Sequence, residues 1–175
     1  MTTPIDDIDR QILDLLQRDA RMTNAAIAAQ VGLAGPSVFE RIRKLEQRGV
    51  IRGYTVTLDP AALGRPMTAF IRITAAFDER YESGVRAISQ DPEVLECYNV
   101  AGEDCFILKT QCGSPTDLEA LLGRIRSRLT VLRSVTMIAL SALKEHGPIH
   151  AAEGPPRSPA RPARARKARL SGRGR

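Results

Sequence analysis

Tryptophan is absent from this chain of 175 residues, and aromatic side chains make up only 4% of it. No stretch approaches the roughly 20 apolar residues that a membrane-spanning helix needs. The first residues, MTTPIDDIDRQ, contain no basic segment followed by an apolar run, so the sequence predicts no signal peptide. The hydrophobic content of 43% is nevertheless enough for a core, and this length can hold one large or two small domains. We therefore expect a cytoplasmic protein.

Cysteine and histidine are also scarce, which argues against several kinds of site. The three cysteines form no pair at close metal-ligand spacing, and their odd number argues against a disulfide framework. An acidic cluster at Glu103-Asp104-Cys105 has neither histidine near it in the sequence, so no metal site is predicted. We interpret the cysteines as small strand residues, with a redox role as the alternative. No nucleophile–base arrangement or phosphate-binding loop is recognisable, so the sequence predicts neither an enzyme nor a cofactor.

Positive charge is concentrated at the C-terminal end of the chain. Residues 151–175 contain eight Lys or Arg and one Glu, whereas residues 1–150 contain 18 basic and 19 acidic residues. Residues 148–175 are rich in Pro, Ala and Arg and contain few large apolar side chains, so we predict a disordered basic tail. Two interpretations of the tail remain open: a non-specific grip on DNA that weakens steeply with salt, or an extension with little effect.

The segment from Thr23 to Arg48 predicts two helices joined by a tight turn, after a first helix at about residues 6–19. Thr23 is a candidate N-cap and Gly32 a candidate left-handed C-terminal stop. Gly35 followed by Pro36 suits the start of the next helix, with Gly35 as N-cap. A helix-turn-helix places one helix in the major groove of DNA, so the segment predicts a protein that reads double-stranded DNA.

A helical wheel of residues 36–48 divides the third helix into an apolar and a polar side. The apolar cluster consists of Val38, Ile42 and Leu45, flanked by Phe39, and is expected to pack on the first two helices. The side chains predicted to face DNA are Ser37, Glu40, Arg41, Lys44 and Arg48. Arg43 points between the two sides and is a weaker candidate.

Each of these polar side chains has a chemistry that suits DNA. Arg41 can make a two-pronged contact with guanine or hold a phosphate, while Lys44 and Arg48 suit phosphates. Ser37 can approach a base edge or the backbone, and Glu40 can accept from a cytosine amine or orient Arg41. A solvated charged face is the alternative, but residues 41–52 hold five basic residues against one acidic residue, which favours DNA binding.

The rest of the chain predicts a second, α+β domain. Residues 50–58 favour an extended arm or short strand, and we place the domain boundary at residues 59–66. Strands are expected at 67–77, 94–100, 105–112 and 135–143, and helices at 81–90 and 114–128. This β-α-β-β-α-β order is the ferredoxin-like unit, an antiparallel sheet with helices on one face. Four large side chains are candidates for the other face, which implies a partner subunit: Phe70, Tyr98, Phe106 and Met137.

Several separate motifs closely resemble the Lrp/AsnC family of bacterial and archaeal transcription regulators. In the first half they are DDIDRQILDLLQRDARMTNAAIAAQVGL and VFERIRKLEQRGVIRGYTVTLDPAALG. In the second half they are ECYNVAGEDCFILK and SVTMIALSALKE. The resemblance covers about residues 5–147, with the motifs in the order and spacing of the family, and leaves the Arg-rich tail outside.

The resemblance implies an N-terminal winged or arm-extended helix-turn-helix domain, taken as residues 1–58, and a C-terminal sensor domain, often called RAM, at 67–147. It implies homodimers that assemble into tetramers or octamers, and an amino acid or related metabolite as effector. Carried over by position, the effector site consists of Ala101, Gly102, Glu103, Asp104, Ser134 and Thr136. In that arrangement Asp104 or Glu103 would hold an α-ammonium group, and Ser134, Thr136 and backbone amides the carboxylate.

Two departures from the family pattern are visible. Many members have Ser before the recognition helix where this chain has Ala34, and many have Gly-x-x-Asp in the effector loop where Cys105 stands here. The expected function is a sequence-specific, effector-modulated transcription regulator. The alternatives are a nucleoid-associated architectural protein and, more remotely, a regulatory part of an enzyme.

Overall fold

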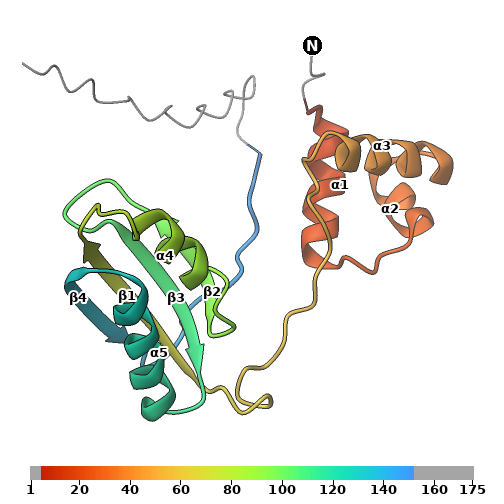
Figure 1. The fold of residues 1–175 in the computed structure, drawn as a ribbon. Coiled ribbons are helices and arrows are strands. Elements are labelled where there is room, and N and C mark those ends of the chain that lie inside the picture. The colour runs from red at the N-terminus through yellow and green to blue at the C-terminus, as the bar shows by residue number, and fades with distance from the viewer. Residues whose placement is uncertain (1–4, 152–175) are drawn as a thin grey trace, which may run out of the picture. The chain divides into compact units, whose positions relative to one another are not determined.

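The computed structural model describes residues 5–151, which form two compact units (Figure 1). The first unit, which we call the helical unit, contains the chain up to Tyr54 together with the residues from Gly147 onward. The second, the sensor unit, extends from Thr55 to His146. Most of the predicted basic tail lies outside the described residues. No helix within the described range is long and apolar enough to cross a membrane.

The helical unit consists of α1 (Asp7–Arg18), α2 (Asn24–Val31) and α3 (Gly35–Gln47). A capping box starts α1, because the backbone N–H of Asp9 donates to Asp6 Oδ1 at 2.8 Å while the Asp9 carboxylate accepts from the Asp6 N–H. The core buries side chains from all three helices: Ile12, Ile27, Ala28 and Val38. The predicted caps of α2 are confirmed. The hydroxyl of Thr23 accepts from the Ala26 N–H, and Gly32 adopts a left-handed φ of 68°.

The start of α3 differs from the prediction by one residue. Ala34, not Gly35, is the N-cap, and its carbonyl accepts from the N–H groups of Ser37 and Val38 at 3.0 and 3.2 Å. Pro36 therefore occupies the second helical position, where its missing N–H costs nothing because the first N–H groups of a helix have no partner within it. Gly49 follows the C-cap Arg48 and adopts a left-handed φ of 69°.

Residues 50–58 form an extended arm, and the described chain contains no strand before Met67. Of the two alternatives expected for this segment, the extended arm is the one that the structure shows. The apolar side chains of the arm remain largely exposed: Tyr54, Val56 and Leu58.

The sensor unit has the predicted β-α-β-β-α-β order. Its elements are β1 (Met67–Ala75), α4 (Tyr81–Ile88), β2 (Val94–Asn99), β3 (Phe106–Cys112), α5 (Pro115–Arg128) and β4 (Val131–Ile138). The antiparallel sheet has the strand order β2-β3-β1-β4, and both helices lie on one of its faces (Figure 1). The last strand was predicted at 135–143 but lies at Val131–Ile138. Its pairing with β1 begins at Ala75↔Val131 and ends at Ala69↔Ile138.

Alternation along β1 separates the two faces of the sheet. The odd-numbered residues from Ala69 to Ala75 are buried under the helices, together with Leu121 and Ile125 of α5. The helices approach closely at Gly84, where an added Cβ would lie 2.5 Å from the backbone oxygen of Arg128. A side chain at that position would force α4 and α5 apart.

The face of the sheet opposite the helices is uncovered. Phe70, Tyr98 and Met137 are exposed there, with 37%, 56% and 45% of their surfaces accessible, as predicted. The placement of Phe106 on this face is wrong, since it is fully buried in the core. It pairs with Ile73, and side chains of paired residues point to the same side of a sheet.

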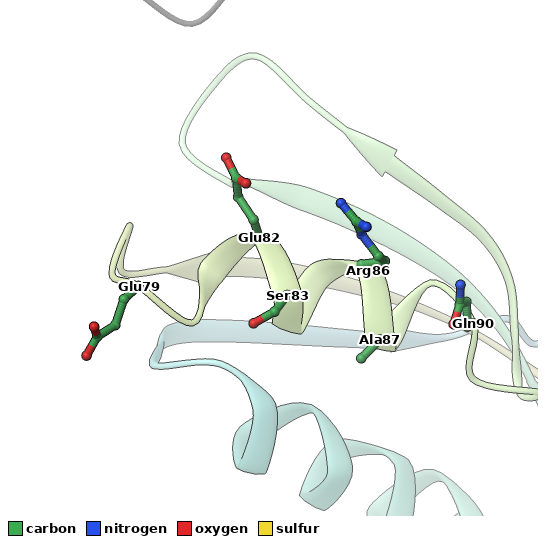
Figure 2. A pocket seen from close by; sticks show the side chains of 6 residues that line it. All are labelled: Glu79, Glu82, Ser83, Arg86, Ala87 and Gln90. Atoms are coloured by element: carbon green, nitrogen blue, oxygen red, sulfur yellow. The ribbon is translucent and has the colours of Figure 1, made fainter. Parts of the chain in front are cut away.

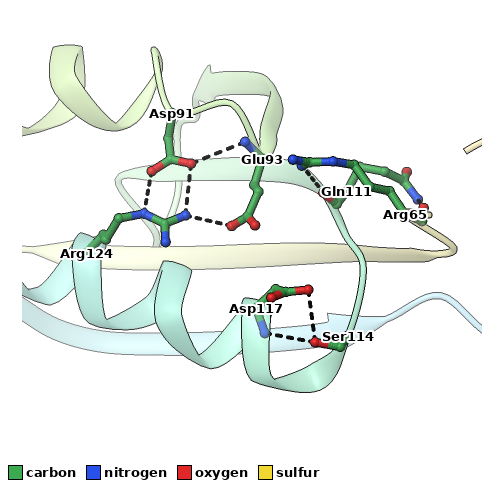
Figure 3. Close-up of polar contacts among 7 residues, drawn as sticks. All are labelled: Arg65, Asp91, Glu93, Gln111, Ser114, Asp117 and Arg124. Carbon is green, nitrogen blue, oxygen red and sulfur yellow. Dashed lines mark hydrogen bonds and ion pairs between the residues drawn. The ribbon is translucent and has the colours of Figure 1, made fainter. Parts of the chain in front are cut away.

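An arginine on α5 fastens the segment that precedes β2 (Figure 3). Arg124 Nε lies 2.7 Å from Asp91 Oδ2, and its Nη2 lies 2.6 Å from Glu93 Oε2. The hydrogen bonds from Arg124 outweigh the effect of burial and lower the pKa of Asp91 below its usual value. A cap at Ser114, whose hydroxyl accepts from the Asp117 N–H, starts α5 in the same region.

Candidate nucleic-acid interface and effector loop

The third helix presents a polar face to solvent, but this face is rotated relative to the prediction. Val38 and Leu45 are buried and set the inward direction. The exposed polar side chains of the helix are Ser37, Glu40, Arg43, Lys44, Glu46 and Gln47. Arg43, predicted to point between the faces, is instead exposed, and sequence reasoning missed Gln47. We call Ser37, Glu40, Arg43 and Lys44 the exposed polar row.

Arg41 and Arg48 lie at the edge of this face, each about half-buried. Arg41 follows Val38 by three residues and precedes Leu45 by four, so it is a neighbour of both buried side chains on the helix surface. Arg48 follows Leu45 by three residues, so it is likewise a neighbour of a buried side chain on the helix surface. The wheel reading that placed both arginines opposite the apolar cluster is corrected by this geometry.

Arg41 contacts the first helix. Its Nη1 lies 2.7 Å from Asp6 Oδ2 and 2.8 Å from Asp9 Oδ1, and the Asp9 side chain is only 10% exposed. These hydrogen bonds raise the pKa of Arg41. Burial raises the pKa of Asp6, but its hydrogen bonds from the Asp9 N–H and from Arg41 outweigh this and lower it. In this structure Arg41 fastens α3 to the N-terminus of α1, and a contact with guanine would require it to leave both carboxylates.

The exposed polar row contains one internal ion pair. Arg43 Nη2 lies 2.9 Å from Glu40 Oε2, one turn away, and both side chains are about half exposed. Such an exposed pair is worth little and opens easily, so either partner is available to another ligand. Lys44 makes no ion pair with the described residues. The row thus offers a hydroxyl, a carboxylate, a guanidinium and an ammonium to a groove about one helix wide.

The loop predicted to bind an effector folds onto the uncovered face of the sheet. Gly102 has a φ of 146°, a conformation that favours glycine. Asp104 is buried, and its Oδ2 lies 2.7 Å from Arg72 Nε and 2.6 Å from Arg72 Nη2. Thr74 donates to the carbonyl of Glu103 at 3.2 Å. The carboxylate of Asp104 is therefore already neutralised by an arginine of β1.

The structure does not bring all six predicted effector residues together in one chain. Ser134 pairs with Ile73, and Thr136 pairs with Ile71, so both side chains point to the helix-covered side of the sheet. Arg72 and Asp104 lie on the opposite side. Sequence reasoning missed Arg72 and Arg133, which pair with the loop at Asp104 and Glu103. The sequence feature that could have identified Arg72 and Arg133 is the presence of a charged residue at each position within an otherwise largely apolar strand.

A shallow pocket of about 460 Å³ lies on the outer side of α4, away from the predicted residues (Figure 2). Its lining is polar and charged, and consists of Glu79, Glu82, Ser83, Arg86, Ala87 and Gln90. No predicted site residue lines it, and its polar walls do not resemble the mostly apolar lining typical of small-molecule sites.

Comparison with known families and structures adds an independent line of evidence. Residues 5–46 match the AsnC-type helix-turn-helix domain, and residues 68–149 match the Lrp/AsnC ligand binding domain. The first match lies within the helical unit, and the second covers the sensor unit from β1 onward and continues for three residues beyond it.

Individual relatives cover most of the chain. It is 36% identical over 138 residues to the HTH-type transcriptional regulator LrpA of Mycobacterium tuberculosis, a match that spans 79% of this chain and 92% of that protein. It is 33% identical over 144 residues to the leucine-responsive regulatory protein of Escherichia coli, covering 81% and 88% of the two chains. The structure superposes with a TM-score of 0.74 on a feast or famine regulatory protein from M. tuberculosis complexed with L-methionine, at 37% identity and 81% and 95% coverage.

Proposed function

Since the chain belongs to the Lrp/AsnC family of transcription regulators, we propose that α3 binds the major groove and that an amino acid bound to the sensor unit modulates this binding. The observation that carries the proposal is the coincidence of two family matches, 5–46 and 68–149, with two separately folded units. The relatives are regulators and not enzymes. The proposed domain boundaries are 1–58, 59–66 and 67–147, with the remainder as a tail.

On the DNA side, we infer that the exposed polar row makes the contacts in the groove. Arg43 can turn from Glu40 to a guanine edge, and Lys44 can hold a phosphate. Arg41 and Arg48 support the helix from its flanks, and Arg41 does so through the carboxylates of α1. In a homodimer two such helices would read half-sites separated by whole turns of the duplex.

On the effector side, we infer that an α-amino acid binds at residues 101–104, where Gly102 allows close approach to the backbone. Glu103 is the exposed carboxylate of this loop, whereas Asp104 is held by Arg72. A ligand that used Asp104 for its ammonium group could place its carboxylate near Arg72. Ser134 and Thr136 could join only from a neighbouring copy of the chain, because in one chain they lie on the other side of the sheet.

A site that draws Ser134 and Thr136 from a neighbouring copy requires assembly, and the uncovered face of the sheet is a candidate surface for it. Phe70, Tyr98 and Met137 expose large apolar side chains on that face, and burying them in a partner would be favourable. We therefore propose a homodimer, with further assembly into tetramers or octamers. We place the protein in the cytoplasm, bound to the nucleoid.

A screen of the twenty amino acids by thermal shift, followed by DNA binding with each hit, tests the effector role. An amino acid that binds the folded state raises the melting temperature, and a modulating effector also changes the affinity for the DNA upstream of the gene. Asp104→Ala should reduce the response while leaving effector-free DNA binding intact. If no amino acid changes either quantity, the effector assignment is wrong.

An architectural, nucleoid-associated role is the second candidate, and the eight basic residues against one acidic residue in 151–175 favour it. Competition binding separates the two functions. A specific regulator retains its preference for the upstream DNA in the presence of excess unrelated DNA at moderate salt, whereas an architectural protein loses it.

A further inference from the structure

Glu40 lies at the centre of the outward face of α3. Successive residues of an α-helix turn by about 100°, so Glu40 points about 160° away from Val38 and about 140° away from Leu45. Those two side chains are buried in the helical unit, at 0% and 1% exposure, whereas the Glu40 side chain is 48% exposed. If α3 binds the major groove with its outward face, the carboxylate of Glu40 therefore meets the base edges.

A carboxylate at this position is unfavourable beside DNA unless a hydrogen-bond donor faces it. The phosphates repel it, and enclosing a charge without a partner is costly. In the free protein Arg43 supplies the partner, since its Nη2 donates to Glu40 Oε2 at 2.9 Å. When Arg43 turns to a guanine, Glu40 loses this partner inside the groove. The carboxylate then needs a donor from a base.

The four bases differ in what they offer a carboxylate in the major groove. Guanine presents two acceptors, N7 and O6, and thymine presents the acceptor O4 beside a methyl group, so both repel it. Adenine presents its amine next to the acceptor N7, whereas cytosine presents an amine with no acceptor of its own beside it. Glu40 therefore favours cytosine, and it does so largely by rejecting the other bases.

Arg43 provides a guanidinium on the same side of the helix. Its side chain is 51% exposed, and the ion pair that holds it is exposed and opens easily. Arg41, by contrast, is 31% exposed and is held by Asp6 and Asp9 at 2.7 and 2.8 Å. A guanidinium can donate to O6 and N7 of guanine at once, so Arg43 is suited to read this base.

The spacing of Glu40 and Arg43 matches the spacing of base pairs. Residues three apart rise by about 4.5 Å along a helix, and successive base pairs are about 3.4 Å apart. We propose that the two side chains read neighbouring G·C pairs in each half-site, Glu40 accepting from a cytosine amine and Arg43 donating to the guanine of the next pair. The proposal rests on the DNA-binding function proposed above. It holds for either strand, because a cytosine on either strand belongs to a G·C pair.

The experiment selects duplexes from a randomised pool with the full-length protein and then measures affinities for single-base variants of the selected site. For the parent we expect two adjacent G·C pairs in each half-site, at which any other base pair weakens binding about 5- to 100-fold. Glu40→Gln should move the preference at one of these positions from cytosine toward adenine, because an amide both donates and accepts. Arg43→Ala should abolish the guanine preference at the other position.

Two matched variants separate base reading from charge. Glu46→Gln removes the same charge as Glu40→Gln from an exposed position of the same helix, and Lys44→Ala removes a cation next to Arg43. Both should alter affinity about equally for all sequences and leave both base preferences intact. All four variants change exposed side chains, and circular dichroism checks that each retains its helices.

The outcomes also separate this proposal from the function on which it rests. A parent protein that selects no sequence would overturn both. If the parent selects a site without adjacent G·C pairs, or if Glu40→Gln leaves every preference unchanged, DNA reading stands and the proposal alone is overturned. It is likewise overturned if Glu40→Gln relaxes the guanine position that depends on Arg43, since Glu40 would then only orient the arginine.

Discussion

The two units of this protein are stabilised in different proportions by apolar packing and by polar contacts. The core of the sensor unit contains twelve buried residues, whereas that of the three-helix unit contains four. A small core buries a smaller fraction of the chain and leaves less free energy to offset conformational entropy. The helical unit therefore depends more on its capping box, its helix caps and the contact of Arg41 with α1.

Among the described residues, each unit contains an arginine that two carboxylates hold, and the two clusters differ in what surrounds them. Arg124 binds Asp91 and Glu93 within the sensor unit, and its role is structural. Arg41 binds Asp6 and Asp9 on the flank of the helix that we propose binds DNA. In the helical unit, a contact of Arg41 with DNA would therefore require it to leave the carboxylates that fasten α3 to α1.

The largest effect is expected from Phe106→Ala. Removing this fully buried ring leaves a cavity in the larger core and should cost about 3–5 kcal/mol of unfolding free energy. Hydrogen exchange measured peptide by peptide in denaturant should show reduced protection in residues 67–138 and not in 7–47. Equally reduced protection in both units would contradict their separation.

Arg124→Ala should have the next largest effect. It leaves Asp91, whose side chain is only 6% exposed, without its ionic partner, at an expected cost of about 1–3 kcal/mol. Arg126→Ala changes an exposed arginine on the same helix and should stay within about 0.5 kcal/mol of the parent. Urea unfolding of both variants at neutral pH measures this difference, and equal midpoints would contradict a structural role for the cluster.

The same variant predicts a difference in pH dependence. The pKa of Asp91 is lower in the folded protein than in the unfolded chain, because Arg124 stabilises the carboxylate. Its contribution to stability is therefore fully present above the unfolded value, about 3.9, and is lost as the pH falls through the lower folded value. Urea midpoints of the parent should fall more steeply than those of Arg124→Ala below about pH 4. Parallel curves would show that the pair contributes no such linkage.

A smaller effect on stability is expected from Arg41→Ala, about 1 kcal/mol, because the arginine is partly exposed. Its effect on DNA binding distinguishes two roles. If Arg41 positions α3, affinity should fall for every sequence and base preference should be retained. If Arg41 reads a guanine, preference at one position of the half-site should relax, and binding to the preferred base should weaken by about 1–3 kcal/mol. Binding to a panel of single-base variants of the site measures both quantities.

The smallest effect is expected from Lys44→Ala, which removes one exposed ammonium from the exposed polar row. Binding should weaken about uniformly across sequences, and the salt slope should fall by about one. Lys144→Ala, an exposed lysine of the sensor unit, is the matched control and should leave the slope unchanged. Identical slopes for the two variants would show that Lys44 makes no phosphate contact.

The order of the elements was predictable from the sequence because apolar periodicity is a local property. The alternation in β1 and the caps Thr23 and Gly32 each depend on a few neighbouring residues. For residues 50–58 the sequence left an extended arm and a short strand as alternatives, because strand formation depends on a pairing partner that the local pattern does not reveal. The placement of Phe106 was wrong because the face it occupies depends on its register with Ile73, more than 30 residues away.

The candidate site was predictable to a lesser degree for the same reason. Arg41 was assigned to the exposed side because a wheel shows only one helix, whereas its partners Asp6 and Asp9 lie on another. Arg72 was missed because its contact with Asp104 joins residues 32 positions apart. Long-range ion pairs decide which charged groups remain available to a ligand, and no local pattern encodes them.

The central claim, that the sensor unit and α3 are coupled, is tested most directly by measuring one coupling in both directions. The affinity for upstream DNA is determined with and without the amino acid that gives the largest thermal shift, and the affinity for that amino acid is determined with and without DNA. Coupled sites must change each other's affinity by the same factor. We predict equal factors that differ from one. An amino acid that binds with the same affinity in the presence and absence of DNA would contradict the account.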